Sequence, residues 1–267
     1  MPPSRLKLHV LSSGSGGNAS IVEDSDTGDC IAIDCGICKR DFLMRSAECG
    51  VDLSRLSAIL ITHDHSDHVC GLGVVMRGLA KQGAHPTIYA DEAVQLASGA
   101  IRKLQGDFEI RSLEIGGDLA ISTIGVHAFR TSHDAASSCG FRFECGDESI
   151  GFMTDTGIVT PQAHDSLDRC RILAIESNHD ERMLWNGEYP YYLKQRIASD
   201  SGHLSNDACT VEISKLLWDG LEEIVAMHIS KNNNTFPLAT GTIQAMLDDL
   251  DHPARLCCGR ESRAVSV

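Results

Sequence analysis

The sequence predicts an α/β protein in which β-sheets are covered by helices. Its 267 residues are enough to bury a sizeable core, and 42% of them are hydrophobic, an ordinary value for a globular protein. Short apolar runs of strand length alternate with segments of helical spacing along the whole chain. Because we find no repeat of fixed period and no low-complexity linker, we expect one domain over residues 1–267.

The first third of the chain alternates strands with glycine turns. We predict strands at 6–12, 20–24, 30–36 and 56–62, and helices at 38–49 and 69–82. Gly50 and Gly83 are placed to end the two helices. The run LSAILIT at 56–62 is almost entirely apolar, which indicates a strand buried on both faces.

The remaining two thirds continue the same alternation. We predict strands at 87–90, near 107–114, at 119–132, 171–177 and 223–230, a hairpin of 139–146 and 149–155, and helices from Asp91, at 204–218 and at 238–250. Many strands with interspersed helices favour sheets layered by helices.

Composition limits the classes of protein to consider. No apolar run approaches the roughly 18–20 residues of a membrane helix, and the N-terminal residues lack the apolar stretch of a secretory signal. We therefore expect a cytoplasmic protein with no membrane segment, whose eleven cysteines are buried, reduced thiols. The net charge of −14 disfavours a polyanionic partner, because non-specific nucleic-acid binding depends on basic surface.

The stretch ITHDHSDHVCGL, directly after the strand predicted at 56–62, concentrates potential metal ligands. It places His63, His65, Asp67 and His68 in the pattern His-x-His-x-Asp-His. His63 and His65 can face one metal ion, and Asp67 and His68 can then face a second. A strand end is where α/β proteins usually place their sites. The alternative is a polar loop whose residues cap the next helix.

Two metal ions need more ligands than one loop supplies. Three later positions qualify: His133 in TSHDA, Asp155 in FMTDTG and His228 in VAMHIS. Each follows a predicted strand, so a sheet can bring all three to one edge. Taken singly, each is more often a hydrogen-bonded histidine or a turn aspartate.

Four motifs follow one another along the chain: THDHSDH, a single His, TDTG and a late HIS. In this order they resemble the metallo-β-lactamase superfamily over nearly the whole chain. The resemblance implies an αββα sandwich, two mixed sheets flanked by helices, with two divalent metal ions at one edge. It implies these ligands: His63, His65 and His133 for one metal, Asp67, His68 and His228 for the other, and Asp155 as the bridge. Asp34 in IAIDCG matches an aspartate that orients the cluster loop, or is an ordinary turn residue.

Longer phrases narrow the resemblance. Four segments are informative: SSGSGGNAS, ESNHD, YPYYLKQRIASDSGHLSN and HISKNNN. They resemble the YycJ/WalJ group of bacterial double-stranded DNA 5′-exonucleases. The chain is thus expected to be a 5′-to-3′ exonuclease with zinc or manganese as its metal. His68 stands where true β-lactamases of this fold carry arginine. The alternatives are an RNA-processing nuclease, a glyoxalase II-like thioester hydrolase and a non-catalytic, metal-stabilised scaffold. The C-terminal RLCCGRESRAVSV resembles nothing that assigns it a role.

Phosphodiester cleavage requires an attacking oxygen, neutralisation of phosphoryl charge and help for the leaving alkoxide. We predict that a metal-bridging hydroxide attacks in line and that Asp67 orients it. His203, in SGHLSN, is predicted to protonate the leaving group or contact the phosphate, with Glu176 supporting it. The alternative for His203 is a cap on the helix at 204–218, a role that Ser205 or Asn206 fills better.

The predicted contacts with a DNA substrate lie in loops that flank these residues. They are Ser13, Ser15 and Asn18 in the glycine-rich loop, Ser205 and Asn206, and the basic residues Lys194, Arg196 and Lys231, with Tyr191 and Tyr192 for stacking. Backbone amides of SSGSGGN would cradle a phosphate, or the glycines serve only a tight strand connection. The basic residues would form a local strip on an acidic protein, or a solvated helix face.

Overall fold

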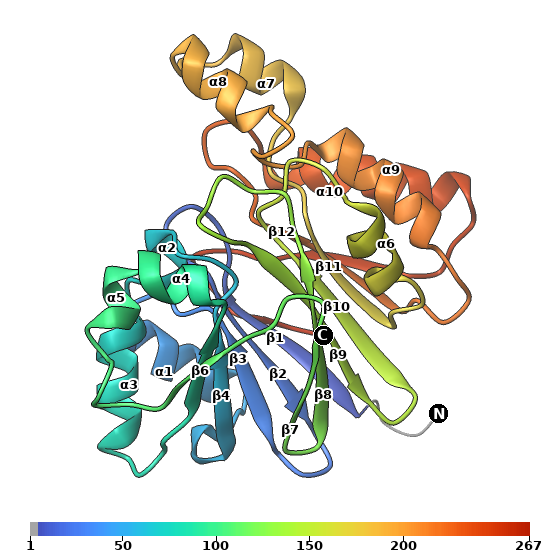
Figure 1. The fold of residues 1–267 in the computed structure, drawn as a ribbon. Coiled ribbons are helices and arrows are strands. Elements are labelled where there is room, and N and C mark those ends of the chain that lie inside the picture. The colour runs from blue at the N-terminus through green and yellow to red at the C-terminus, as the bar shows by residue number, and fades with distance from the viewer. Residues whose placement is uncertain (1–4) are drawn as a thin grey trace.

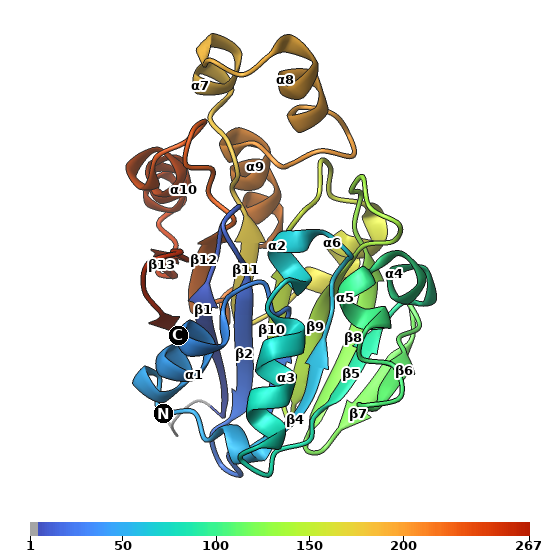
Figure 2. The ribbon, with the colours of Figure 1, turned by 90° about the vertical axis from the view of Figure 1, so that its left-hand side faces the viewer.

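Two seven-stranded β-sheets pack face to face, and helices cover both outer faces (Figure 1, Figure 2). The structure, a computed structural model, describes residues 5–267. The first sheet has the order β14 (Val265–Ser266), β1 (Leu6–Ser12), β2 (Ala19–Asp24), β3 (Cys30–Ile33), β4 (Leu56–Leu60), β5 (Thr87–Ala90), β6 (Ile110–Ser112). The second has the order β13 (Arg255–Cys258), β12 (Glu223–Met227), β11 (Ile172–Glu176), β10 (Glu148–Met153), β9 (Cys139–Cys145), β8 (Ile124–Arg130), β7 (Asp118–Ile121).

The helices divide between the two sheets. Those that follow the strands of the first sheet are α1 (Lys39–Glu48), the 3₁₀ turn Leu53–Arg55, α2 (Ser66–Val69), α3 (Leu72–Ala80), α4 (Glu92–Ala97) and α5 (Gly99–Arg102). Those on the side of the second sheet are α6 (Pro161–Leu167), α9 (Asn206–Leu216) and α10 (Phe236–Asp249). A further pair, α7 (Glu181–Asn186) and α8 (Tyr191–Ile197), projects beyond the sandwich (Figure 1).

Three apolar layers hold this arrangement together. The middle layer lies between the sheets and includes Phe141, Phe143 and Leu8, each with no exposed surface. The two outer layers lie between each sheet and its helices. Because both faces of the sheets are buried, strands such as β12 are buried at every residue, and this explains their continuous apolar sequences. The predicted αββα sandwich is confirmed.

Most predicted elements are present with bounds within three residues of the prediction, and two differ. The helix expected at 69–82 is broken into α2 and α3 around Gly71. The single strand expected at 119–132 is the hairpin of β7 and β8, which turns at Ser122, whose φ is 51°. The sequence analysis does not predict α6 and α7. Hydrophobic periodicity encodes neither the chain reversal at Ser122 nor the packing that breaks the helix at Gly71.

Two glycines fix the loop that carries the histidine cluster. A Cβ atom on Gly36 would lie 1.6 Å from the carbonyl oxygen of Asp67, and one on Gly71 would lie 1.8 Å from that of Ile37. The close approach allows the Cys35 N–H to donate to the His68 carbonyl at 2.7 Å. The break between α2 and α3 is therefore a packing requirement of the cluster loop.

The C-terminal residues, whose role the sequence left open, complete both sheets. β13 pairs with β12 in the second sheet, and β14 pairs with β1 in the first. Between them, the Arg260 carbonyl accepts from the Ser13 N–H, and Glu261 accepts from the Gly16 N–H at 2.8 Å. The tail thus joins the two sheets and holds the glycine-rich loop in place.

All eleven cysteines are free, as expected, but the prediction that they are buried is wrong for Cys38 and Cys70, which are exposed, and holds only in part for Cys49 and Cys257, which are half-buried. Cys38 and Cys70 flank the tightly packed segment around Gly36 and Gly71. Over residues 5–267, none of the helices has the length and apolar character needed to span a membrane.

We predict that Gly71→Ala lowers the free energy of unfolding by at least about 2 kcal/mol, because the new methyl group overlaps a backbone oxygen that cannot move aside. The measurement is urea denaturation. The control is Gly241→Ala on α10, where a Cβ meets nothing within 4 Å, and where alanine should add about 0.5–1 kcal/mol. Equal stability of the two variants would contradict the packing argument.

Candidate functional site

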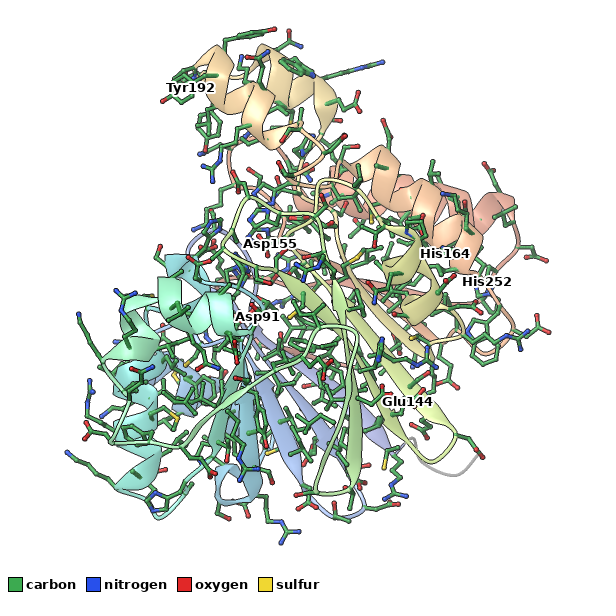
Figure 3. All side chains as sticks on the ribbon, viewed as in Figure 1. Asp91, Glu144, Asp155, His164, Tyr192 and His252 are labelled. Carbon is green, nitrogen blue, oxygen red and sulfur yellow. The ribbon has the colours of Figure 1, made fainter. Side chains whose placement is uncertain are left out.

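The candidate site lies at one edge of the sandwich, where parallel strands of both sheets end. Asp34 follows β3 and the His63–His68 cluster follows β4, which runs parallel to β3. In the second sheet His133 follows β8, Asp155 follows β10, and β10, β11 and β12 are mutually parallel. Figure 3 shows Asp155 at this edge, beneath the α7–α8 hairpin. The topology therefore brings together side chains that are far apart in the sequence.

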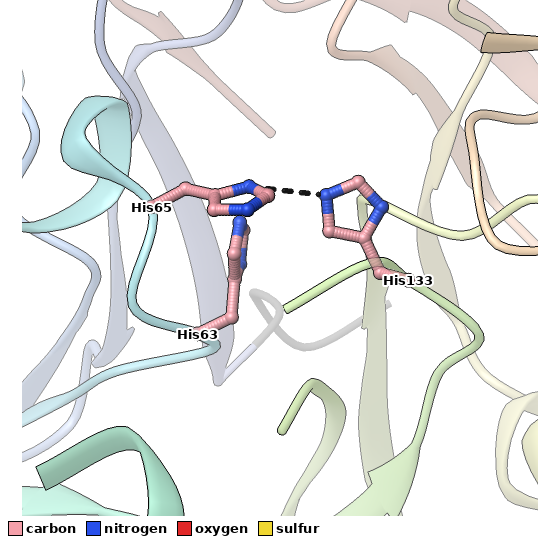
Figure 4. A group of neighbouring side chains, drawn as sticks. All are labelled: His63, His65 and His133. Carbon is pink, nitrogen blue, oxygen red and sulfur yellow. Dashed lines mark hydrogen bonds between the residues drawn. The ribbon is translucent and has the colours of Figure 1, made fainter. Parts of the chain in front are cut away.

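His63, His65 and His133 form the first group. Their ring centroids lie 4.6 Å apart for His63 and His65, and 5.0 Å for each of the other two pairs. Figure 4 shows the rings converging, with 3.2 Å between His133 Nε2 and His65 Nδ1. Nitrogen atoms of all three lie within 4.8 Å of one another, close enough to share a cation.

Asp67, His68 and His228 form the second group, with ligand atoms also within 4.8 Å of one another. Asp155 stands between the groups: its Oδ2 is 3.3 Å from His68 Nε2 and its Oδ1 is 3.8 Å from His133 Nε2. The centroids of His63 and His68 are only 4.1 Å apart. The arrangement is that of two adjoining sites with a carboxylate between them.

In four of these histidines the Nδ1 atom is held by another group. His68 Nδ1 donates to Asp34 at 2.7 Å, and His228 Nδ1 donates to Glu176 at 2.9 Å. His133 Nδ1 donates to the Gly202 carbonyl at 2.9 Å. Thr62 Oγ1 donates to Asp34 and accepts from His63 Nδ1 at 3.0 Å. Fixing the proton on Nδ1 makes Nε2 the nitrogen of each ring that can bind a metal ion.

Unpaired polar atoms show that these residues fit a metal centre. Among the described residues, His63 Nε2, His228 Nε2 and Asp155 Oδ2 are buried side-chain atoms with no hydrogen-bond partner. Buried acceptors are normally paired, because leaving one unpaired costs about 1–3 kcal/mol. All three belong to the two groups described above, and a cation between them would satisfy all of them.

Three of the site residues have strained backbones. Asp34, Asp155 and His228 have φ values of 58°, 55° and 53°, a conformation uncommon for residues other than glycine. Each directly follows, or nearly follows, the last residue of a strand. Such strain persists only where surrounding contacts enforce it, and it clusters at functional sites. Here it turns the side chain from the strand direction toward the shared centre.

Glu176 and His203 form a pair beside the metal-binding groups. Glu176, the last residue of β11, is fully buried, and its Oε1 accepts from His203 Nδ1 at 2.8 Å. Burial alone would raise the pKa of Glu176, but the charge and hydrogen bonds of His203 and His228 lower it to about 2. Burial acts to lower the pKa of His203, and the charge of Glu176 raises it above the ordinary value.

The predicted polar contacts with the substrate differ in their exposure. Ser15 is exposed and lines a cavity next to His203 and His228. Ser13 is buried, and its hydroxyl accepts from the His228 N–H at 2.8 Å, so it positions that histidine. Asn18 is also buried, with its Nδ2 3.0 Å from His68 Nε2.

The residues after His203 serve the fold. Ser205 caps α9 by accepting from the Ala208 N–H, which leaves His203 free of the capping role. Asn206 is buried in hydrogen bonds with Ser177 and Asn234. Neither side chain is directed at the cluster.

The predicted basic strip is already engaged within the protein. Lys194 donates to the carbonyls of Trp185 and Gly187 and so closes the α7–α8 hairpin. Arg196 forms an ion pair with Asp134, and Lys231 forms one with Glu261. These cations can reach a phosphate only by exchanging a partner.

The amides of the glycine-rich loop are engaged as well. The N–H of Gly14 donates to the Asn18 side chain, that of Gly17 to the Gly14 carbonyl, and that of Asn18 to the Asp67 carbonyl. Because these groups have partners inside the fold, the structure favours a tight strand connection over a phosphate cradle.

Sequence reasoning missed two residues that shape the site. Thr62 links Asp34, His63 and His68 through one hydroxyl, and its position directly before the cluster was the available signal. Glu261 holds the glycine-rich loop from the C-terminal tail, where no pattern pointed to it.

Comparisons with known proteins agree with this geometry. Residues 30–229 match a family described as "Beta-lactamase superfamily domain". The chain is 34% identical over 248 residues to Exodeoxyribonuclease WalJ of Streptococcus pneumoniae, covering 92% of this chain and 90% of the relative. It is 31% identical over 254 residues to Exodeoxyribonuclease YycJ of Bacillus anthracis, covering 91% and 90%.

A solved structure shares the fold at low sequence identity. It is that of the metallo-β-lactamase fold protein YhfI from Bacillus subtilis, with a TM-score of 0.74 and 12% identity, and the match covers 99% of this chain and 100% of that one.

We predict that Asp155→Ala purifies with little or no bound metal, since it removes the carboxylate that lies between both groups. Metal per chain is measured by elemental analysis of protein loaded with zinc and with manganese. The matched control is Asp64→Ala, because Asp64 lies within the cluster but its carboxylate accepts from the Ala136 N–H. Full metal content in Asp155→Ala would refute the placement of that residue between two ions.

Proposed function

The chain belongs to the metallo-β-lactamase superfamily, within its YycJ/WalJ-like group, and from this we propose that it is a metal-dependent exodeoxyribonuclease. One observation carries the proposal: ligands from four segments converge at one sheet edge, in a chain that matches two named exodeoxyribonucleases over about nine tenths of its length. A site retained for structure alone would need fewer ligands. We also propose that residues 1–267 act as one domain, since both sheets share a central apolar layer.

Two metal ions are proposed, one per ligand group. His63, His65 and His133 would hold one, Asp67, His68 and His228 the other, and Asp155 both. Bound there, divalent ions would activate water near neutral pH and neutralise phosphoryl charge. Imidazole-rich ligand sets with carboxylates accept zinc or manganese, so we propose one of these metals.

Asp67 is proposed to orient the attacking water. Its Oδ2 lies 3.5 Å from His68 Nε2 and 3.7 Å from His228 Nε2, whereas its side chain keeps about a quarter of its surface exposed. Asp34 holds His68, and Glu176 and Ser13 hold His228. The carboxylate therefore faces the opening of the site from a rigid setting, where it can accept a hydrogen bond from the attacking water.

His203 is proposed to protonate the leaving oxygen. Its Nδ1 is fixed by Glu176, so Nε2 is the nitrogen available to substrate, and its side chain is 22% exposed. The other oxygen of Glu176, Oε2, accepts from the N–H groups of Thr156 and Leu204. Glu176 is thus a positioning residue, and its negative charge favours the protonated imidazole that donation requires.

For the substrate we propose double-stranded DNA, degraded from 5′ ends, and contacted mainly at its backbone. The named relatives support DNA, and the phrases ESNHD and HISKNNN support this group within the superfamily. We propose a cytoplasmic location, because all eleven cysteines are unpaired.

The proposed function is tested with blunt duplexes labelled at the 5′ or the 3′ end, using protein stripped by chelator and reloaded with zinc or manganese. We expect the 5′ label to be released as small products at once and the 3′-labelled strand to shorten progressively, only after metal is restored. Hydrolysis of S-lactoylglutathione, or of a tRNA precursor, with the duplexes left intact would overturn the assignment.

We predict that His203→Ala lowers kcat on DNA by about 10²–10⁴-fold, the usual size of a general-acid contribution. The p-nitrophenyl ester of thymidine 5′-phosphate should lose far less, because p-nitrophenolate leaves without protonation. Steady-state kinetics on both substrates make the comparison. His164→Ala is the control, since His164 lies on α6 and pairs with Glu212 away from the site (Figure 3). Equal losses on both substrates would contradict proton donation by His203.

A further inference from the structure

A cavity of about 190 Å³ adjoins the candidate site beneath the α7–α8 hairpin. His203 and His228 form part of its wall, and Leu193 and Ile197 of α8 line it together with Tyr189. Leu193 and Ile197 are four residues apart, so they lie on the same side of the helix. Both are half-buried on a helix that has no buried residue. The helix therefore presents apolar side chains to a cavity and not to a packed core.

The opposite wall of the cavity is polar. Asn178, Ser230 and Asn233 come from the loops that follow β11 and β12. The Asn178 amide donates to the His228 carbonyl at 2.8 Å, and Ser230 accepts from the Asn233 N–H. By contrast, within residues 5–267 the side-chain amide of Asn233 takes part in no hydrogen bond. It offers one acceptor and two donor hydrogens to a ligand.

A ligand for this cavity needs a flat apolar face, a polar edge and an attached phosphate group that reaches the adjacent candidate site. Nucleobases have these properties: they stack on aromatic side chains irrespective of sequence, and their edges pair with an amide. We infer that the cavity binds the base of the terminal nucleotide, with Tyr189 and Leu193 over its face and Asn233 at its edge. This inference rests on the proposed nuclease function and specifies which part of the substrate the cavity binds.

A second cavity explains how the rest of the strand is accommodated. It has a volume of about 350 Å³, is lined by Gly157, His179 and Trp185, and shares His203 with the first cavity. A phosphate at His203 would therefore have room for one nucleotide on each side. The first cavity is the smaller of the two and lies under the hairpin, which suits a chain end.

The inference is tested by removing one base from the substrate and truncating one side chain of the cavity wall, singly and together. Three 5′-phosphorylated duplexes are compared: unmodified, with a tetrahydrofuran abasic residue at the 5′ terminus, and with the same residue at the second position. Each is assayed with metal-loaded wild type, Leu193→Ala, and the control Gln195→Ala. Gln195 is on the same helix, is exposed and does not line the cavity.

We expect wild type to remove an unmodified terminal nucleotide with a kcat/KM about tenfold above that for the abasic terminus, as loss of one stacked base implies. Leu193→Ala should process both at the slower rate, whereas Gln195→Ala should keep the full preference. An abasic residue at the second position should have a smaller effect. The inference is overturned if wild type does not distinguish the two termini, or if Leu193→Ala slows both equally.

A binding measurement separates this inference from the proposed function. Thymidine 5′-monophosphate and 2-deoxyribose 5-phosphate are titrated calorimetrically into metal-loaded protein. We expect Leu193→Ala to weaken binding of the nucleotide about tenfold and to leave binding of the sugar phosphate unchanged. If the wild-type protein degrades no duplex, the proposed function is wrong. The comparison of the two ligands then tests by itself whether the cavity binds a base. Equal affinity of wild type for the two ligands would refute base binding.

Discussion

The structure depends on one electrostatic constraint: imidazole nitrogens and carboxylate oxygens converge in a volume from which water is largely excluded. His63 and His68 have no exposed side-chain surface, and their rings are 4.1 Å apart. Lone pairs so close together repel unless a cation lies between them, and the burial of unpaired acceptors adds to the cost. Metal ions resolve this conflict, so metal binding and the stability of this edge of the sandwich are coupled.

The rest of the fold can be understood as the means of imposing that convergence. Parallel strands in both sheets end at the same edge, and the residues that follow them adopt left-handed backbones at Asp34, Asp155 and His228. Gly36 and Gly71 allow the cluster loop to contact neighbouring backbone, where any side chain would overlap it. The C-terminal strands close both sheets and fix the glycine-rich loop whose Ser13 holds His228. Strain near the centre is thus balanced by packing and hydrogen bonds around it.

Charge shapes how such a protein approaches a polyanion. The chain carries a net charge of −14, and Arg196 and Lys231 already form ion pairs. In the proposed function, attraction for phosphate would come mainly from the metal centre, where bound divalent cations would concentrate positive charge. The projecting α7–α8 hairpin adds apolar and aromatic surface beside Lys194 and Arg196, which already have partners within the fold. Binding of this kind should depend less on salt than binding through lysine and arginine.

The sequence by itself determined that strands alternate with helices, and it marked His63, His65, Asp67 and His68 as candidate ligands, because apolar periodicity and residue spacing are local properties of the chain. Resemblance to a known superfamily supplied the αββα sandwich and the grouping with His133, Asp155 and His228. Only the tertiary structure decided the contacts that join distant segments. For example, Thr62 links three site residues, and the C-terminal tail completes both sheets. Leu193 and Asn233 likewise line one cavity. Such contacts depend on chain reversals and on packing between segments, neither of which leaves a periodic signal in the sequence.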